Sequence, residues 1–213
     1  EREAIASSAF WTAKKRYAMC VWDMEGVRMP ADKPKIKIQG LEAIRSSTPK
    51  RCKKPLLDVI ELTLLQDEAA VQQFILDFKS EFFEYEVGDI AMPRSMNNIK
   101  KFTLSGGDHA KGTPLHVRGA ITYNYMLEHH GIENYWEKIR DGEKGKFIYV
   151  NVPNTVNSDV ISFVTSIPKE FGVDKYLNKE KMFEKIIIDP VKNILEPIGW
   201  SVEKKLTLDA FFG

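Results

Sequence analysis

The chain has 213 residues, 43% of them hydrophobic and 29% charged, and its formal net charge is +1. This composition predicts a globular protein of one large or two small domains and excludes a disordered chain. The longest apolar runs, such as Ile186-Ile187-Ile188, are too short to cross a bilayer, and the acidic start lacks the apolar segment of a signal peptide. We therefore expect no membrane as a partner. Cys20 and Cys52 predict neither a disulfide framework nor a metal site.

The N-terminal part is predicted to be rich in strands. Residues 11–24 contain many aromatic and apolar residues and predict a strand that ends at the turn Glu25-Gly26. Residues 35–38 alternate polar and apolar side chains and predict a short, half-buried strand. Ser46-Ser47-Thr48-Pro49 predicts a helix start, with a hydroxyl N-cap and proline at the first helical position. The helix after it directs four apolar residues inward: Leu56, Val59, Ile60 and Leu64.

The rest of the chain is predicted to be mainly helical. A second helix begins near Asp67 and places apolar residues at helical spacing, with acidic residues on the opposite, solvated face. The remaining predicted elements are short strands within residues 87–104, a helix over 117–130, a strand over 146–152, and a helix over 180–195 interrupted at Pro190. A strand-rich start followed by a helical body predicts the α+β class.

Motifs for catalysis are absent from the sequence. It has no glycine-rich phosphate loop, no H-E-x-x-H helix, no paired Cys-x-x-Cys and no nucleophile elbow. Asp23 and Glu25 have no third carboxylate nearby, and the neighbouring side chains of His129 and His130 diverge on a helix. His116 lies beside a cation, which disfavours a metal ligand. We therefore predict no catalytic residue, no metal site and no cofactor in this chain.

Charge is distributed unevenly. Residues 1–60 hold 13 Lys or Arg and 7 Asp or Glu, residues 61–90 hold 1 and 8, and residues 91–118 hold 5 and 1. Two basic stretches around an acidic one are compatible with a nucleic-acid surface, although charge runs also form ordinary solvated faces.

Lys14-Lys15-Arg16-Tyr17 is the clearest binding motif in the first basic stretch. Placed on one strand, Lys15 and Tyr17 would lie on one face, with Lys14 and Arg16 on the other. Lysines and a tyrosine suit the backbone and minor groove of a duplex without detailed readout of sequence. Lysines on an edge strand can also serve to deter strand pairing, so the motif alone leaves both interpretations open.

The last nine residues form a second motif, Lys205-Leu206-Thr207-Leu208-Asp209-Ala210-Phe211-Phe212-Gly213. One helical turn would bring Leu208 together with Phe211 and Phe212, which suits insertion into a hydrophobic pocket of a partner. The alternative is an ordinary C-terminus that packs on its own domain.

Taken in order, these motifs resemble the C-terminal palm and thumb of family B replicative DNA polymerases of T-even-type bacteriophages. The resemblance is nearly continuous to about residue 125, weak over 126–180, and returns at the last helix and tail. One departure is a shorter connection between Ala6 and Phe10, and another is lysine in place of the leading glutamine of a clamp-binding peptide. The resemblance is carried by residues 10–17, 21–26, 36–42, 45–50, 97–99, 114–119 and 122–124.

The resemblance implies a role for each motif. Residues that match DNA contacts are Lys14, Lys15, Arg16, Tyr17, Arg45, Ser46, Ser47, Thr48, Asn97, Asn98, Lys111, His116 and Arg118. Leu208, Phe211 and Phe212 match a sliding-clamp-binding tail. The implied organisation is the end of the palm with a Lys-Lys-Arg-Tyr hairpin over residues 1–44, a mainly helical thumb over 45–199, and the tail over 200–213.

The implied function is that of a C-terminal fragment of a DNA-directed DNA polymerase, in the cytoplasm of an infected bacterial host. The fragment would grip the primer–template duplex and tether the enzyme to the clamp during phage DNA replication. The catalytic aspartates, and the Mg²⁺ that the complete polymerase binds, would belong to the remainder of the polymerase, so this chain alone is expected to be inactive.

Two other functions fit the residues. The chain could be a stand-alone DNA-binding accessory chain of a split polymerase, or a non-catalytic protein-interaction module whose basic stretches are only solvated faces.

Overall fold

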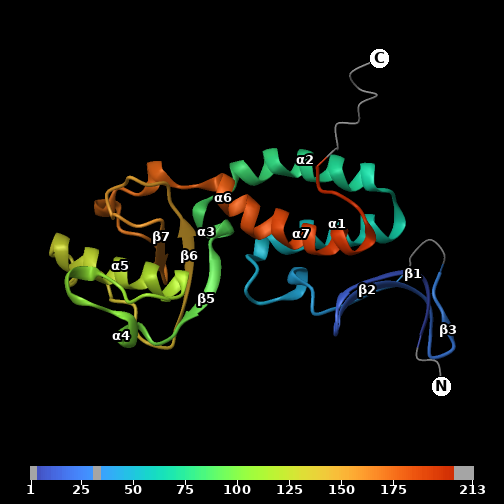
Figure 1. The fold of residues 1–213 in the computed structure, drawn as a ribbon, viewed down its shortest axis with the longest axis horizontal. Coiled ribbons are helices and arrows are strands. Elements are labelled where there is room, and N and C mark those ends of the chain that lie inside the picture. Colours follow the sequence, from blue (N-terminus) through green and yellow to red (C-terminus); the bar gives the residue numbers. More distant parts are fainter. Residues whose placement is uncertain (1–3, 31–34, 204–213) are drawn as a thin grey trace, which may run out of the picture. The chain divides into compact units, whose positions relative to one another are not determined.

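The computed structural model describes residues 4–30 and 35–203, and packing divides the chain into two compact units (Figure 1). Unit 1 combines residues 1–84 with 183–213, and unit 2 is formed by residues 85–182. Each unit joins helices to a small antiparallel sheet, which confirms the predicted α+β class. The predicted domain boundaries at residues 44 and 199 rest on the resemblance and stay a prediction.

The sheet of unit 1 is built around one central strand. Strand β2 (Arg16–Met24) pairs antiparallel with β1 (Ala4–Ala13), β3 (Val27–Arg28) and β4 (Lys35–Gln39). The predicted strand over residues 35–38 is therefore confirmed as β4. The single strand predicted over residues 11–24 is wrong, because the chain reverses at Lys14 and Lys15 and pairs Ala13 with Arg16. Lys15 makes this two-residue turn with a φ of 62°.

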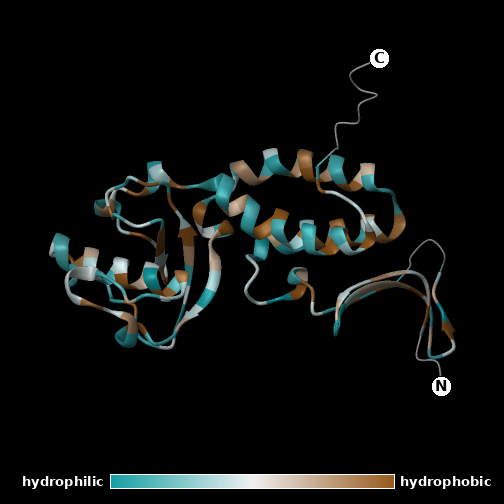
Figure 2. Cartoon of the chain, viewed as in Figure 1, coloured by the Kyte–Doolittle hydropathy of each residue, from teal (hydrophilic) through white to brown (hydrophobic). Residues whose placement is uncertain are grey.

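The core of unit 1 lies between one face of this sheet and a layer of helices. The buried sheet residues include Phe10, Ala18 and Cys20, and the helices that contact β1 are α1 (Lys50–Leu65) and α7 (Asp189–Leu195). The four residues predicted to face inward from α1 are all buried: Leu56, Val59, Ile60 and Leu64. Figure 2 shows hydrophobic and hydrophilic residues alternating along α1, α2 and α7, as expected of amphipathic helices.

The second helix of unit 1, α2 (Glu68–Glu84), follows its predicted pattern closely. Four of its five predicted apolar positions are buried, namely Val71, Ile75, Phe78 and Phe82, while Phe74 is half-buried. The predicted acidic face is exposed at Asp77, Glu81 and Glu84.

The last helix is interrupted at Pro190, as predicted. The chain runs through α6 (Lys179–Phe183), a π-helical turn η5 (Glu184–Ile188), α7 and a 3-10 turn η6 (Glu196–Ile198). Proline has no N–H to donate into the ladder, and the widened turn places the Asp189 N–H on the Glu184 carbonyl oxygen instead.

Unit 2 packs helix α5 (Leu115–His130) on the three-stranded sheet β5 (Met92–Met96), β6 (Glu143–Tyr149) and β7 (Val160–Phe163), in the order β5-β6-β7. The predicted helix over 117–130 and strand over 146–152 are confirmed with shifted ends. Of the strands predicted within 87–104, only β5 forms, because α3 (Val87–Ile90) and α4 (Ile99–Phe102) bury their isoleucines from short helical turns. Strand β7 was not predicted from the sequence. Three short 3-10 turns complete the unit: η2 (Ser105–Gly107), η3 (Lys169–Phe171) and η4 (Asp174–Tyr176).

Candidate nucleic-acid interface

The turn between β1 and β2 presents two exposed lysines. Lys14 and Lys15 occupy the turn itself, and both side chains are exposed. Within residues 4–30 and 35–203, neither lysine has a hydrogen-bond or ion-pair partner. Trp11 and Tyr17 pair across the two strands directly behind the turn, with ring centroids 6.3 Å apart. Trp11 is 59% exposed, so cations and a flat aromatic surface occur side by side.

Gly40 fixes the position of this turn. It follows β4 with a φ of 68°, and a Cβ at this position would lie 2.3 Å from the carbonyl oxygen of Lys15. No side chain can occupy that space without a shift of the turn. Local sequence does not reveal this constraint on Gly40, because the backbone that crowds it is 25 residues away in sequence.

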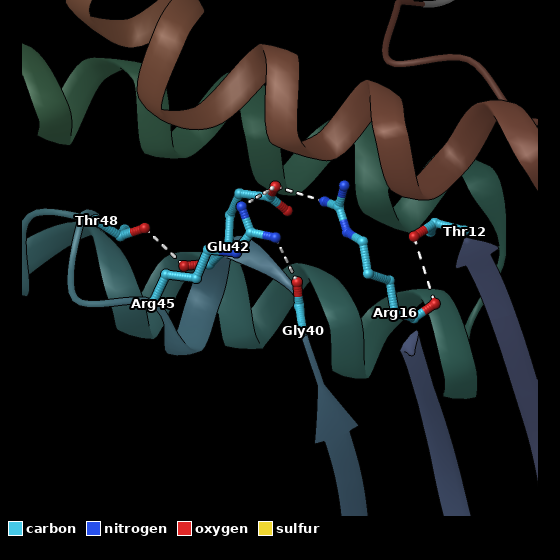
Figure 3. Close-up of polar contacts among 6 residues, drawn as sticks. All are labelled: Thr12, Arg16, Gly40, Glu42, Arg45 and Thr48. Atoms are coloured by element: carbon cyan, nitrogen blue, oxygen red, sulfur yellow. Dashed lines mark hydrogen bonds and ion pairs between the residues drawn. The ribbon is translucent and has the colours of Figure 1, made fainter. Parts of the chain in front are cut away.

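Glu42 joins the hairpin to the start of α1 (Figure 3). Its Oε1 lies 2.5 Å from Arg16 Nη2 and 3.4 Å from Arg45 Nη1. Arg45 also donates to the Gly40 carbonyl oxygen at 3.0 Å, and Thr48 Oγ1 donates to the Glu42 carbonyl oxygen at 2.6 Å. One carboxylate therefore holds two of the arginines that were predicted to contact DNA.

The predicted hydroxyl N-cap at residues 46–48 is wrong. Pro49 occupies the position before the first residue of α1 and has no side-chain group that could cap the helix, while the Thr48 hydroxyl donates to the turn η1 (Glu42–Ile44). Thr48 is 8% exposed, Ser47 is half-buried and Ser46 is exposed. Of the three hydroxyl residues predicted to contact a backbone, Ser46 is therefore the most accessible.

Replacing Glu42 with alanine is expected to destabilise unit 1 by about 1–3 kcal/mol, because a half-buried Arg16 would lose its charged partner. The Arg16 and Glu42 side chains are only 28% and 20% exposed. Chemical denaturation measures the change. Asp58→Ala is the matched control: its partner Lys54 is 82% exposed, so water already solvates that charge and the change should be much smaller.

The predicted contacts of unit 2 lie after β5, in the turn before α5 and in the first turn of α5. Asn97 and Asn98 are exposed after β5, and Asn98 precedes α4 in the left-handed region with a φ of 64°. Lys111 is exposed in the turn before α5. Eight of the thirteen predicted DNA contacts thus belong to unit 1, and the other five belong to unit 2.

Arg118 and His116 lie in the first turn of α5 and are partly buried. Arg118 Nη2 lies 2.6 Å from Asp159 Oδ1, so this predicted phosphate contact also has a carboxylate partner. Burial lowers the pKa of His116 below its ordinary value, and the charge of Arg94 lowers it further. At neutral pH His116 can therefore donate a hydrogen bond but adds no positive charge.

The lowered pKa of His116 predicts a pH dependence of stability. A histidine whose folded-state pKa is depressed binds fewer protons than in the unfolded chain, so its contribution is present above about pH 6.5 and is lost as the pH falls. Denaturant titrations between pH 8 and pH 5 should show falling stability, and His116→Gln should reduce the slope. The exposed His130→Gln is the control, and an identical slope in both variants would contradict the assignment.

The predicted tail residues lie outside the described part of the chain, and the described part has no metal-binding geometry. The predicted tail residues Leu208, Phe211 and Phe212 are not among the described residues. Within residues 4–30 and 35–203, no group of three or more His, Cys, Asp or Glu could hold a metal ion. The Mg²⁺ implied for a complete polymerase thus finds no ligand set there, and we derive no catalytic step through it.

Comparisons with known proteins show similarity to DNA polymerases. No family model matches the chain. Over its whole length it is 32% identical to the DNA-directed DNA polymerase of Enterobacteria phage T4 and 33% identical to that of Escherichia phage RB69. Over its whole length the chain is similar to one segment of each of these phage DNA polymerases. It spans 24% of the length of each of these relatives.

The fold of the chain resembles a segment of a further DNA polymerase. The family B DNA polymerase of the archaeon Pyrobaculum calidifontis matches 92% of the chain with a TM-score of 0.57, at 17% identity and over 22% of that structure. At this identity the match concerns the fold alone. No helix in the described part of the segment is long and apolar enough to span a membrane.

Residues that complete the site were not among the predicted contacts. Glu42 contacts Arg16 from 26 positions away, Asp159 contacts Arg118 from 41 positions away, and Gly40 lies against Lys15 from 25 positions away. Trp11 belongs to residues 10–17, which carry the resemblance. Its pairing with Tyr17 depends on the hairpin, which had been predicted as a single strand.

Proposed function

We propose that this polymerase segment grips the primer–template duplex as part of a DNA-directed DNA polymerase. The observation that carries the proposal is the exposed Lys14-Lys15 turn, backed by Trp11 and Tyr17 and fixed in place by Gly40. Unpaired lysines lose no protein partner when they bind phosphate, and an aromatic pair beside them provides a flat surface for sugar or base edges.

The arginines contribute differently from the lysines. Arg16, Arg45 and Arg118 each have a carboxylate partner, so a phosphate contact would share or replace that partner. We therefore assign the main electrostatic contribution to Lys14, Lys15 and Lys111, and a supporting role to the arginines. Contacts of this kind position a duplex without reading its sequence.

We propose that the tail makes the polymerase more processive. Leu208, Phe211 and Phe212 would bind a sliding clamp and raise the effective concentration of the enzyme at the primer terminus, within the cytoplasm of an infected bacterium. The remainder of the polymerase would supply the catalytic carboxylates and Mg²⁺. We expect no nucleotide incorporation by this chain alone, and primer extension by the purified chain would refute that.

Fluorescence anisotropy with a labelled primer–template duplex over a salt series tests the proposal. With about four to six phosphate contacts, the logarithm of affinity should fall against the logarithm of salt with a slope of about −4 to −5. Unrelated duplex sequences should bind equally, and single-stranded DNA more weakly. Absence of binding at low salt would instead favour a protein-interaction module. Equal function with and without the remainder of the polymerase would favour a stand-alone accessory chain.

A further inference from the structure

The last described residues of the chain are bonded to α2. Glu68 Oε1 accepts the backbone N–H of Ser201 at 2.5 Å, and Gln72 Nε2 donates to the carbonyl oxygens of Ser201 and Glu203 at 2.9 and 3.2 Å. Val202 lies between these groups and is 8% exposed. Two side chains one helical turn apart thus bond three backbone groups of a segment about 130 residues away, and we call them the Glu68–Gln72 bracket.

The identity of Gln72 is explained by these bonds. Its side chain is 7% exposed, and a carboxamide buried to this extent is costly unless its donors are used. Both N–H groups of its Nε2 have acceptors in residues 201–203. An apolar side chain would fill the same space but would leave the Ser201 carbonyl oxygen without this donor, while the Glu203 carbonyl oxygen would keep only the Ser201 hydroxyl at 2.9 Å. The neighbouring Gln73 is exposed and donates to Asp77 on its own helix instead.

We infer that Glu68 and Gln72 are positioning residues that fix where the C-terminal peptide, residues 204–213, leaves the fold. The inference extends the proposed role of that peptide in partner binding and, for its functional consequence, rests on that role. It concerns the first residues of the tail, whereas the proposed clamp contacts are Leu208, Phe211 and Phe212.

The bracket limits how far the tail can reach. From Glu203 to Leu208 the chain has five residues, which span at most about 17 Å when extended. If residues 200–203 were released from α2, the free part of the chain would begin at Gly199. The nine residues from there to Leu208 would span about 30 Å. A partner that holds Leu208 must therefore approach the first half of α2, and opening the bracket would lower the effective concentration of the tail at that place.

Hydrogen–deuterium exchange of the Ser201 amide in the full chain tests the bracket directly. Glu68→Ala removes the acceptor of this amide and should raise its exchange rate about tenfold, while Glu68→Gln keeps an acceptor oxygen and should restore most of the protection. Gln72→Ala should also raise the rate, because it removes one donor from each of the Ser201 and Glu203 carbonyl oxygens. Gln73→Ala, on the same helix, should leave it unchanged.

Each outcome separates the bracket from the proposed partner. Equal exchange rates at Ser201 in the wild-type chain, Glu68→Ala and Gln72→Ala would overturn the inference, provided that protection within α2 shows that the variants are folded. Binding of the wild-type chain to a purified sliding clamp is measured separately. Its failure would refute the proposed partner of the tail without changing the exchange result.

Discussion

Gly40→Ala is expected to displace the Lys14-Lys15 turn and to destabilise unit 1 by about 2–4 kcal/mol. Two costs combine at this position. A methyl group would lie 2.3 Å from the Lys15 carbonyl oxygen, and alanine would also have to adopt a φ of 68°. Since the turn carries the exposed lysines, affinity for a primer–template duplex should fall together with stability. Urea denaturation and fluorescence anisotropy measure the two effects.

Gly26→Ala separates the two costs. Gly26 has a similar φ of 83°, but a Cβ there would meet no atom within 4 Å. We expect this control to cost about 1 kcal/mol from backbone strain alone and to leave duplex affinity unchanged. If both variants lost the same stability and neither lost affinity, the contact between Gly40 and Lys15 would not position the turn.

The long helices of both units could be predicted from local pattern, and the hairpin could not. Helix α2 repeats apolar residues every three or four positions over 17 residues, which is a strong signal. The turn at Lys14 and Lys15 contains no glycine, asparagine or proline, so the continuous aromatic and apolar run around it was read as one strand. Lys15 adopts a φ of 62° in this turn, a conformation that is uncommon for lysine and that the local sequence does not predict.

The candidate site shows the same division between local and distant information. The sequence and its resemblance to phage polymerases supply the cationic residues that fit a DNA surface. They do not show which cations are already paired, because Glu42 is 26 residues from Arg16, and Asp159 is 41 residues from Arg118. The three arginines and the three lysines were all predicted contacts, and only the fold distinguishes the paired residues from the unpaired ones in the described part of the chain.

This distinction has a consequence for how the segment would bind DNA. Removing a paired arginine takes one of two partners from Glu42 or the arginine partner from Asp159, so the loss of affinity would be mixed with a loss of stability. Removing an unpaired lysine changes the charge of the surface and little else. Lysine variants therefore give the cleaner measurement of phosphate contacts.

The double variant Lys14→Ala, Lys15→Ala is expected to reduce the salt dependence of duplex binding by about two contacts. Each phosphate contact contributes about −0.9 to the slope, so a slope of about −4 to −5 should become about −2 to −3. The ratio of wild-type to variant affinity should be about tenfold larger at 50 mM than at 200 mM salt. Stability should remain close to that of the wild-type chain, because neither lysine has a partner in the described part of the protein.

The matched control is Lys169→Ala with Lys192→Ala, two exposed lysines outside the predicted contacts. This control removes the same total charge, so it measures the effect of net charge alone on the approach of DNA. A change of slope that is equal in both double variants would mean that the duplex responds to overall charge, and the turn would lose its assigned role. A change of slope found only in the Lys14, Lys15 variant would instead place two of the released counterions at the β1–β2 turn, whose position Gly40 fixes.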